Sequence, residues 1–168
     1  MRRDVRISIG GSVSTRMKSQ ITYRQDKGIS AGAIRALFKR NEWYDWFTLK
    51  DVEWYLSHSL FVASAWHGRR AVGLAVLTGD GRIGIELDTL LVDESYRRRS
   101  IAKALVAIVV EEAKRREPYY FKVEVYEEQT EELYAGFGFQ RNEGTWLLEY
   151  KGLADRLGQK VRRIRRTH

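Results

Sequence analysis

Residues 87–108 read LDTLLVDESYRRRSIAKALVAI, and this stretch decides which fold we expect. Residues 87–92 are mostly apolar and bounded by polar residues, which is typical of a strand. Residues 93–100 form a polar loop with three consecutive arginines. The segment from residue 101 is too long for a strand and is apolar nearly all round from Ala104 to Val110, which predicts a buried helix.

A strand, a loop and a helix in this order can form an anion site. The start of a helix offers unpaired backbone N–H groups and the positive end of the helix dipole. Ser100 and Ala102 are small enough to let a phosphate approach the backbone, and Arg97, Arg98 and Arg99 add positive charge. The residues alone leave two interpretations open, a phosphate site or an ordinary basic loop.

The surrounding segments predict an α/β or α+β domain with a mixed sheet. Ser30 is a candidate cap for the first helix. The expected elements are a strand at 21–25, helices at 29–40 and 48–59, strands at 60–68, 70–81 and 83–92, a helix at 100–117, a strand at 119–128, a short helix at 131–137 and a hairpin over 137–151.

Length and composition predict a single globular domain. We expect an extension over 1–20, the domain over 21–152 and a basic tail over 153–168. The chain contains no cysteine, which excludes disulfides, thiolate zinc sites and a cysteine nucleophile, and its three histidines offer little for a metal site. Because we find no apolar run of membrane-spanning length and no signal peptide, we expect a cytoplasmic protein with no membrane partner. The lack of cysteine and the few histidines lead us to expect no bound metal.

Two sequence blocks resemble the GNAT superfamily of N-acetyltransferases. Residues 97–102, RRRSIA, match the family pattern [QR]-x-x-G-x-[GA] at its first and last fixed positions, with Ser100 in place of the glycine. Residues 127–139 are similar to N-x-x-A-x-x-L-Y-x-x-x-G-F, with Leu133, Tyr134, Gly138 and Phe139 in place. Glu127 replaces the asparagine, and Thr130 replaces the alanine.

The resemblance implies a GNAT-like fold, with a mixed, mostly antiparallel central sheet of about seven strands flanked by about four helices and splayed after the fourth strand. It implies acetyl-CoA as co-substrate, with the pantetheine arm along the open strand edge and the pyrophosphate at the arginine loop. The cofactor contacts expected from it are Leu90, Leu91, Val92, Arg97, Arg98, Arg99, Ser100, Ile101, Ala102, Lys103, Glu127, Thr130 and Tyr134.

The resemblance also implies direct attack of an amine on the thioester in a ternary complex, with Tyr134 as general acid for the departing thiolate. Packing of Tyr134 in the core is the structural alternative. We expect the Leu90 N–H to contact the thioester oxygen. The two-residue period of a strand places Glu86 and Asp88 on one face with Leu90, so either carboxylate is a candidate base, unless a bulge changes that parity.

The acceptor site is expected in the aromatic stretch at residues 41–55. Trp43, Tyr44, Trp46 and Phe47 could form an aromatic box for an amine, with Glu42 or Asp45 attracting its charge. Core packing is the alternative for each ring. We expect the amine acceptor to be a small molecule in preference to a protein, and a homodimer is left open.

Two other functions are compatible with the sequence. The formal charge of +8 and the arginine run would suit a nucleic-acid-binding module, but an almost wholly apolar helix cannot enter a groove, so nucleic acid is not the favoured partner. A catalytically weak acyl-CoA sensor of the same fold is the second alternative, because Ser100 and Glu127 depart from the family pattern.

Overall fold

The computed structural model describes residues 20–125, 128–141 and 147–150. Most of the predicted N-terminal extension and the whole basic tail lie outside these residues. Every predicted helix and strand is present, and a short 3₁₀ helix, η1, is added in the arginine loop. The elements are β1 (Ile21–Arg24), α1 (Ala31–Arg40), α2 (Leu49–His58), β2 (Phe61–His67), β3 (Arg70–Gly79), β4 (Gly84–Val92), η1 (Glu94–Tyr96), α3 (Ile101–Arg116), β5 (Tyr120–Glu124), α4 (Glu128–Ala135), β6 (Phe139–Arg141) and β7 (Leu147–Tyr150).

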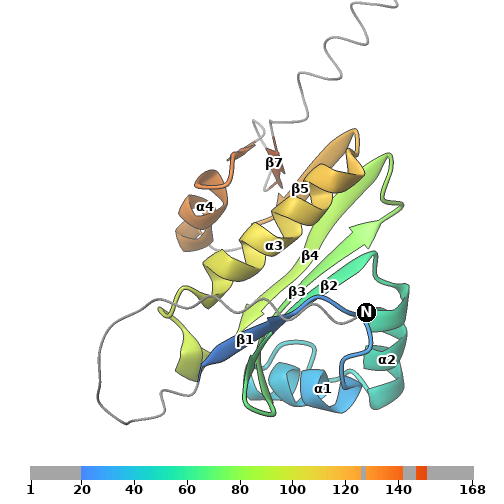
Figure 1. The fold of residues 1–168 in the computed structure, drawn as a ribbon, viewed down its shortest axis with the longest axis vertical. Coiled ribbons are helices and arrows are strands. Elements are labelled where there is room, and N and C mark those ends of the chain that lie inside the picture. The colour runs from blue at the N-terminus through green and yellow to red at the C-terminus, as the bar shows by residue number, and fades with distance from the viewer. Residues whose placement is uncertain (1–19, 126–127, 142–146, 151–168) are drawn as a thin grey trace, which may run out of the picture.

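The strands form one mixed, mostly antiparallel sheet in the order β1-β2-β3-β4-β5-β7-β6. Among the described strands, only β4 and β5 pair in parallel, because α3 carries the chain back across the sheet between them. In Figure 1 the helices lie on both faces of this sheet. The prediction of a mixed, mostly antiparallel α+β fold is therefore confirmed.

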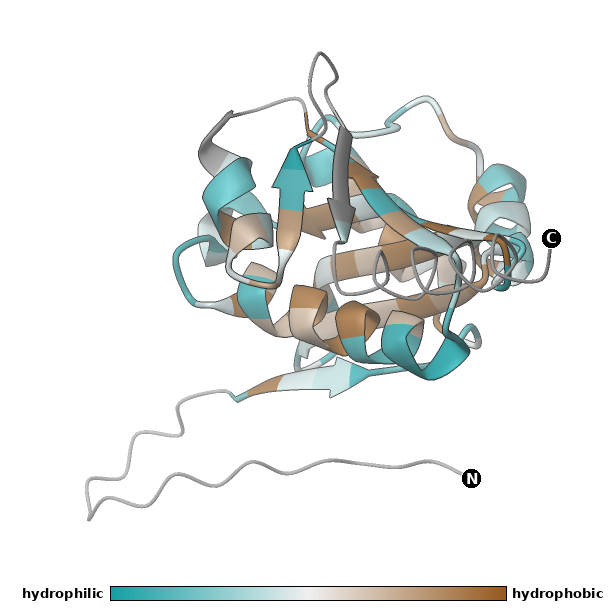
Figure 2. Cartoon of the chain, turned by 90° about the horizontal axis from the view of Figure 1, so that it is seen from above, coloured by the Kyte–Doolittle hydropathy of each residue, from teal (hydrophilic) through white to brown (hydrophobic). Residues whose placement is uncertain are grey.

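Two apolar clusters hold the helices on opposite faces of the sheet. One cluster joins α3 and Tyr134 of α4 to one face, and the other joins α1 and α2 to the opposite face. Figure 2 shows apolar residues along the central strands and α3, with hydrophilic residues at the helix ends. No helix in the described part of the chain is long and apolar enough to cross a membrane.

Helix α3 is buried against the backbone of β3. Leu105, Val106 and Val109 are fully buried. A Cβ atom at Gly73 would lie 3.0 Å from side-chain carbons of both Ile101 and Leu105. The glycine therefore permits close packing of the helix on the sheet, and this packing fixes where α3 begins.

Strands β4 and β5 pair along only part of β4. Their ladder covers Gly84–Leu87 of β4 and Tyr120–Val123 of β5. Strand β4 continues to Val92, paired with β3 alone among the described strands, whereas β5 ends at Glu124. The ladder thus ends where the splay after the fourth strand was predicted.

The buried carboxylate of Asp93 anchors the loop between β4 and α3. Arg40 Nε donates to Asp93 Oδ2 at 2.8 Å, and an Arg70 guanidinium nitrogen donates to the same oxygen at 2.9 Å. The backbone N–H and the hydroxyl of Ser95 donate to Oδ1 at 3.2 and 2.6 Å. Burial alone would raise the pKa of Asp93, but the hydrogen bonds from Ser95, Arg70 and Arg40 hold it well below its usual range.

We expect Asp93→Asn to lower the free energy of unfolding at pH 7 by about 2–3 kcal/mol, because the arginines lose their buried anion. Urea denaturation measures this change. The stabilisation by Asp93 is complete above the ordinary carboxyl pKa of 3.8 and is lost as the pH falls through the lower folded pKa. The difference in the free energy of unfolding between Asp93→Asn and the unchanged protein should therefore become smaller below pH 3.8. Glu94→Gln, at the exposed neighbouring carboxylate, is the control, and equal stability of Asp93→Asn and the unchanged protein at pH 7 would contradict the prediction.

Candidate active site

The first turn of α3 lacks the side-chain cap that the first two helices possess. Ser30 caps α1 as predicted, accepting a hydrogen bond from the Ala33 N–H, and Thr48 forms a capping box with Asp51 on α2. No side chain in the described part of the chain caps α3, and its first turn has no acidic residue. The backbone N–H groups at this helix start therefore remain suited to an anion.

Ser100 precedes α3 in the left-handed backbone conformation, with φ 60° and ψ 14°. Arg98 also has a positive φ of 60°. A side chain makes this conformation unfavourable, and glycine adopts it freely. The geometry thus gives a physical reason for the glycine that the family pattern has at this position.

The three arginines are exposed beside this helix start. Arg99 donates to the Ser95 carbonyl at 3.3 Å, and its guanidinium carbon lies 5.0 Å from the centre of the Tyr96 ring. The Tyr96 hydroxyl lies 2.5 Å from His67 Nδ1. The sequence analysis missed Tyr96 and His67, because only the fold brings the end of β2 beside this loop.

A bulge in β4 contradicts the predicted alternation. Val76 of β3 pairs with Thr89, and the next residue, Leu77, pairs with Leu87, so Asp88 is the extra residue of β4. Leu87 and Leu90 both pack in the cluster beneath α3, although their positions differ by three. The prediction that Leu90 shares a face with Glu86 and Asp88 is therefore wrong, because the bulge reverses the parity.

The two candidate carboxylates have different partners. Glu86 forms an ion pair with Lys122 of β5, with Nζ and Oε2 3.0 Å apart. Asp88 is exposed and accepts hydrogen bonds from the Tyr55 hydroxyl of α2 and, at 3.1 Å, from the Thr89 hydroxyl. Asp88 thus lies at the bulge, beside α2 and just beyond the ladder with β5.

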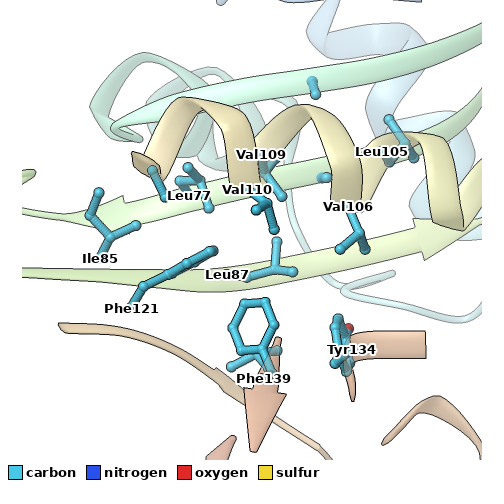
Figure 3. Close-up of a cluster of buried hydrophobic side chains, with 14 of the residues drawn as sticks. Leu77, Ile85, Leu87, Leu105, Val106, Val109, Val110, Phe121, Tyr134 and Phe139 are labelled. Atoms are coloured by element: carbon cyan, nitrogen blue, oxygen red, sulfur yellow. The ribbon is translucent and has the colours of Figure 1, made fainter. Parts of the chain in front are cut away.

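Tyr134 is buried, with 5% of its surface exposed. Figure 3 shows its ring in the same cluster as Val106 and Phe139, and the centres of the Tyr134 and Phe139 rings lie 5.8 Å apart. Burial raises the pKa of Tyr134 to about 12. Thr130 lies one turn earlier on α4 and is half-buried, whereas Glu127 falls outside the described residues.

An open pocket of about 390 Å³ lies between α2 and the connection that precedes it. Trp46 and Phe47, two of the residues proposed for the acceptor site, line this pocket. Trp43 and Tyr44 instead pack against the core of α1 and α2. The other residues of the wall were not predicted, and they are Asp51, Trp54 and Tyr55.

The pocket wall contains one aromatic ring that neighbouring residues hold in place and two tryptophan rings that are exposed. The Arg35 guanidinium donates to the Phe47 carbonyl at 3.0 Å, and the Phe47 ring stacks on Tyr44 with ring centres 4.8 Å apart. Trp46 and Trp54 remain 71% and 63% exposed. The acidic wall residue is Asp51, in place of the expected Glu42 or Asp45. Its spacing from residues 54 and 55, three and four positions along a helix, was the available sequence signal.

Comparisons with known proteins agree with this architecture. Residues 30–139 match the family model described as the acetyltransferase (GNAT) family. A GNAT family acetyltransferase from Streptococcus pneumoniae is 28% identical, with a TM-score of 0.62, and the match covers 72% of this chain and 88% of that one. No curated protein sequence matches the chain significantly.

Two further solved structures share the fold at lower identity. The ribosomal-protein-S18-alanine N-acetyltransferase from Escherichia coli is 16% identical, with a TM-score of 0.61 and coverage of 73% of this chain and 79% of that one. Aminoglycoside 6′-acetyltransferase type Ii is 20% identical, with a TM-score of 0.60 and coverage of 77% and 95%. The matching family model spans most of the described domain, so the chain belongs to the GNAT family of acetyltransferases.

Proposed function

We propose that the protein is an acetyl-CoA-dependent N-acetyltransferase that acts on a small primary amine by direct attack in a ternary complex. The observation that carries this proposal is that one short loop, residues 93–100, connects the part of β4 that extends beyond the β5 ladder to the uncapped start of α3. A pantetheine arm and a pyrophosphate need these two features side by side. The family match weighs against the nucleic-acid alternative, and the turnover assay described below tests the sensor alternative.

The residues fit the cofactor chemically. The exposed Arg97, Arg98 and Arg99 and the backbone from Ser100 to Lys103 would hold the phosphates, and the backbone of Leu90 to Val92 would hold the pantetheine arm. When bound, acetyl-CoA supplies the acetyl group as an activated thioester.

The proposed chemistry assigns one task to each residue. The Leu90 N–H donates to the thioester oxygen as negative charge develops there. Asp88 is the preferred base, because the Glu86 carboxylate is already paired with Lys122. Tyr134 donates its proton to the departing thiolate. Its raised pKa, about 12, keeps the phenol protonated over the whole assay range.

The acceptor would enter through the aromatic pocket. Trp46, Trp54 and Phe47 offer flat apolar surfaces, and Asp51 offers a negative charge at the wall. A hydrogen bond from Thr48 is the main cause of the lowered pKa of Asp51, so this carboxyl is ionised near neutral pH. An amine with an apolar or aromatic body fits this combination better than a polyamine does.

We expect acetyl-CoA at 100 times its dissociation constant to stabilise the protein by about 2.7 kcal/mol, measured by thermal shift. Arg97→Ala should weaken binding by loss of a phosphate contact. Arg82→Ala, at an exposed arginine before the opposite end of β4, should leave binding unchanged. A panel of amines, read by release of free thiol, then tests turnover, and absence of any shift at millimolar acetyl-CoA would exclude the proposal.

Tyr134→Phe should lower kcat by about 100-fold, the usual contribution of a positioned general acid, with little change in acetyl-CoA affinity. Steady-state kinetics at saturating acetyl-CoA measure this loss. Tyr150→Phe changes another tyrosine packed on the same cluster and is the matched control. An unchanged kcat at every pH would assign Tyr134 to the core alone.

Ser100→Gly should raise the free energy of unfolding by about 0.5 kcal/mol, because relief of the left-handed strain exceeds the entropy that glycine adds to the unfolded chain. It should also tighten acetyl-CoA binding by removing a side chain beside the helix start. Ala102→Gly, in the first turn of the same helix, should instead lower stability by about 1 kcal/mol. Urea denaturation measures the stability of both variants, and calorimetry measures their affinity for acetyl-CoA. A lower stability of Ser100→Gly would contradict the prediction that Ser100 is strained.

A further inference from the structure

Tyr55 connects the aromatic pocket to Asp88 of β4. Tyr55 lines the pocket, and its ring lies edge-on to Phe47, with ring centres 6.4 Å apart. Its hydroxyl donates to the Asp88 carboxylate and lies 2.7 Å from the Thr89 hydroxyl. One side chain therefore touches both the proposed acceptor pocket and the proposed base.

The direction of these hydrogen bonds leaves the phenol able to accept another proton. An ionised carboxylate only accepts, so Tyr55 is the donor in its bond to Asp88. A hydroxyl oxygen has accepting capacity besides the proton that it donates. The N–H of an ammonium group in the pocket can thus donate to the Tyr55 oxygen.

We propose that Tyr55 is a catalytic residue that conducts a proton from the acceptor ammonium to Asp88, an inference that rests on the proposed acetyl transfer. As one N–H bond of the ammonium breaks, its proton bonds to the Tyr55 oxygen. At the same time the original phenol proton passes to the Asp88 carboxylate. The step yields a neutral amine, a protonated Asp88 and an unchanged, neutral Tyr55.

The environment of Tyr55 favours this exchange over a phenolate. Burial, and then the negative charge of Asp88, raises the pKa of Tyr55 far above its usual value. The tyrosine therefore gives up its proton only as it receives another. Loss of a proton from an ammonium group creates no buried negative charge, because the group becomes neutral as the proton leaves.

Three titratable groups near the relay have shifted pKa values, and these three, Tyr44, Asp51 and Lys122, keep their charge state near neutral and mildly alkaline pH. Burial raises the pKa of Tyr44, in the connection between α1 and α2, and the Thr48 hydrogen bond lowers that of Asp51. The Glu86 hydrogen bond raises the pKa of Lys122, which faces Glu86 across β4 and β5. The acceptor amine, with a pKa near 10 like that of lysine, then dominates the pH dependence of the proton transfer.

The test compares Tyr55→Phe with the unchanged protein, using 2-phenylethylamine as the probe, whose ring suits the aromatic pocket. At pH 7 kcat should fall by about 100-fold, because the ammonium loses its route to the base. The ratio of the two kcat values should fall as the pH rises toward about 10, where about half of the amine is already neutral. The KM for acetyl-CoA should not change, since the variant keeps the ring and its packing.

Four further measurements separate proton conduction by Tyr55 from a packing role. Tyr23→Phe removes the hydroxyl of a half-buried tyrosine on β1 and should leave kcat unchanged. Asp88→Asn should show the same deficit at pH 7, and the double variant should be no worse than either single variant. The β,β-difluoro analogue of the probe is a weaker base, because fluorine withdraws electrons, and should show a smaller deficit at pH 7.

Two results would overturn the relay while leaving acetyl transfer intact. A Tyr55→Phe deficit of equal size at every pH would assign the residue to packing, and an unchanged kcat at pH 7 would remove it from the chemistry. Failure of the unchanged protein to acetylate 2-phenylethylamine also rejects the inference. If acetyl-CoA also produces no thermal shift, the result rejects the proposed function as well as the relay.

Discussion

The Asp93 carboxylate is buried at the end of β4, and two arginines from different parts of the chain hold it there. Arg40 ends α1 and Arg70 begins β3, so this one anion joins a helix on one face, the central hairpin and the loop that precedes α3. A buried carboxylate is stable only when it is paired and hydrogen-bonded. The need to satisfy Asp93 therefore fixes the path of the loop, and the loop in turn places the start of α3 and the exposed arginines.

The bulge at Asp88 divides β4 into two parts with different neighbours. Before the bulge, β4 pairs with β5 and continues the sheet. After it, the side chain of Leu90 faces α3, while Leu91 packs beneath α1 and α2. Under the proposed function, the strand would offer its backbone edge to the cofactor and the Asp88 carboxylate beside α2 to the acceptor. A regular strand, with Glu86, Asp88 and Leu90 on one face, would not separate these functions.

The positions of individual charged residues indicate the kind of ligand better than the net charge of the chain does. The formal charge of +8 suggests a polyanion partner, yet the arginines at the loop surround a single helix start. Asp51 lines the aromatic pocket, and Asp88 accepts a hydrogen bond from Tyr55 of the same pocket. These carboxylates and the exposed arginines lie on different elements, so the proposed amine and the proposed phosphates would each meet charges of the opposite sign.

The sequence by itself determined the order of elements, the buried helix, the cap at Ser30 and the two motif blocks of the family. These features are local, since they follow from apolar periodicity, from capping chemistry and from spacing along the chain. Periodicity could not reveal the bulge, because one extra residue in β4 depends on its pairing with β3. Nor could it reveal the pairing of Asp93 with Arg40, or of Asp88 with Tyr55, since those partners are 53 and 33 positions apart. The tertiary structure alone decided which carboxylate is held by a salt bridge and which lies beside the aromatic pocket, because only folding brings distant polar groups within hydrogen-bonding distance.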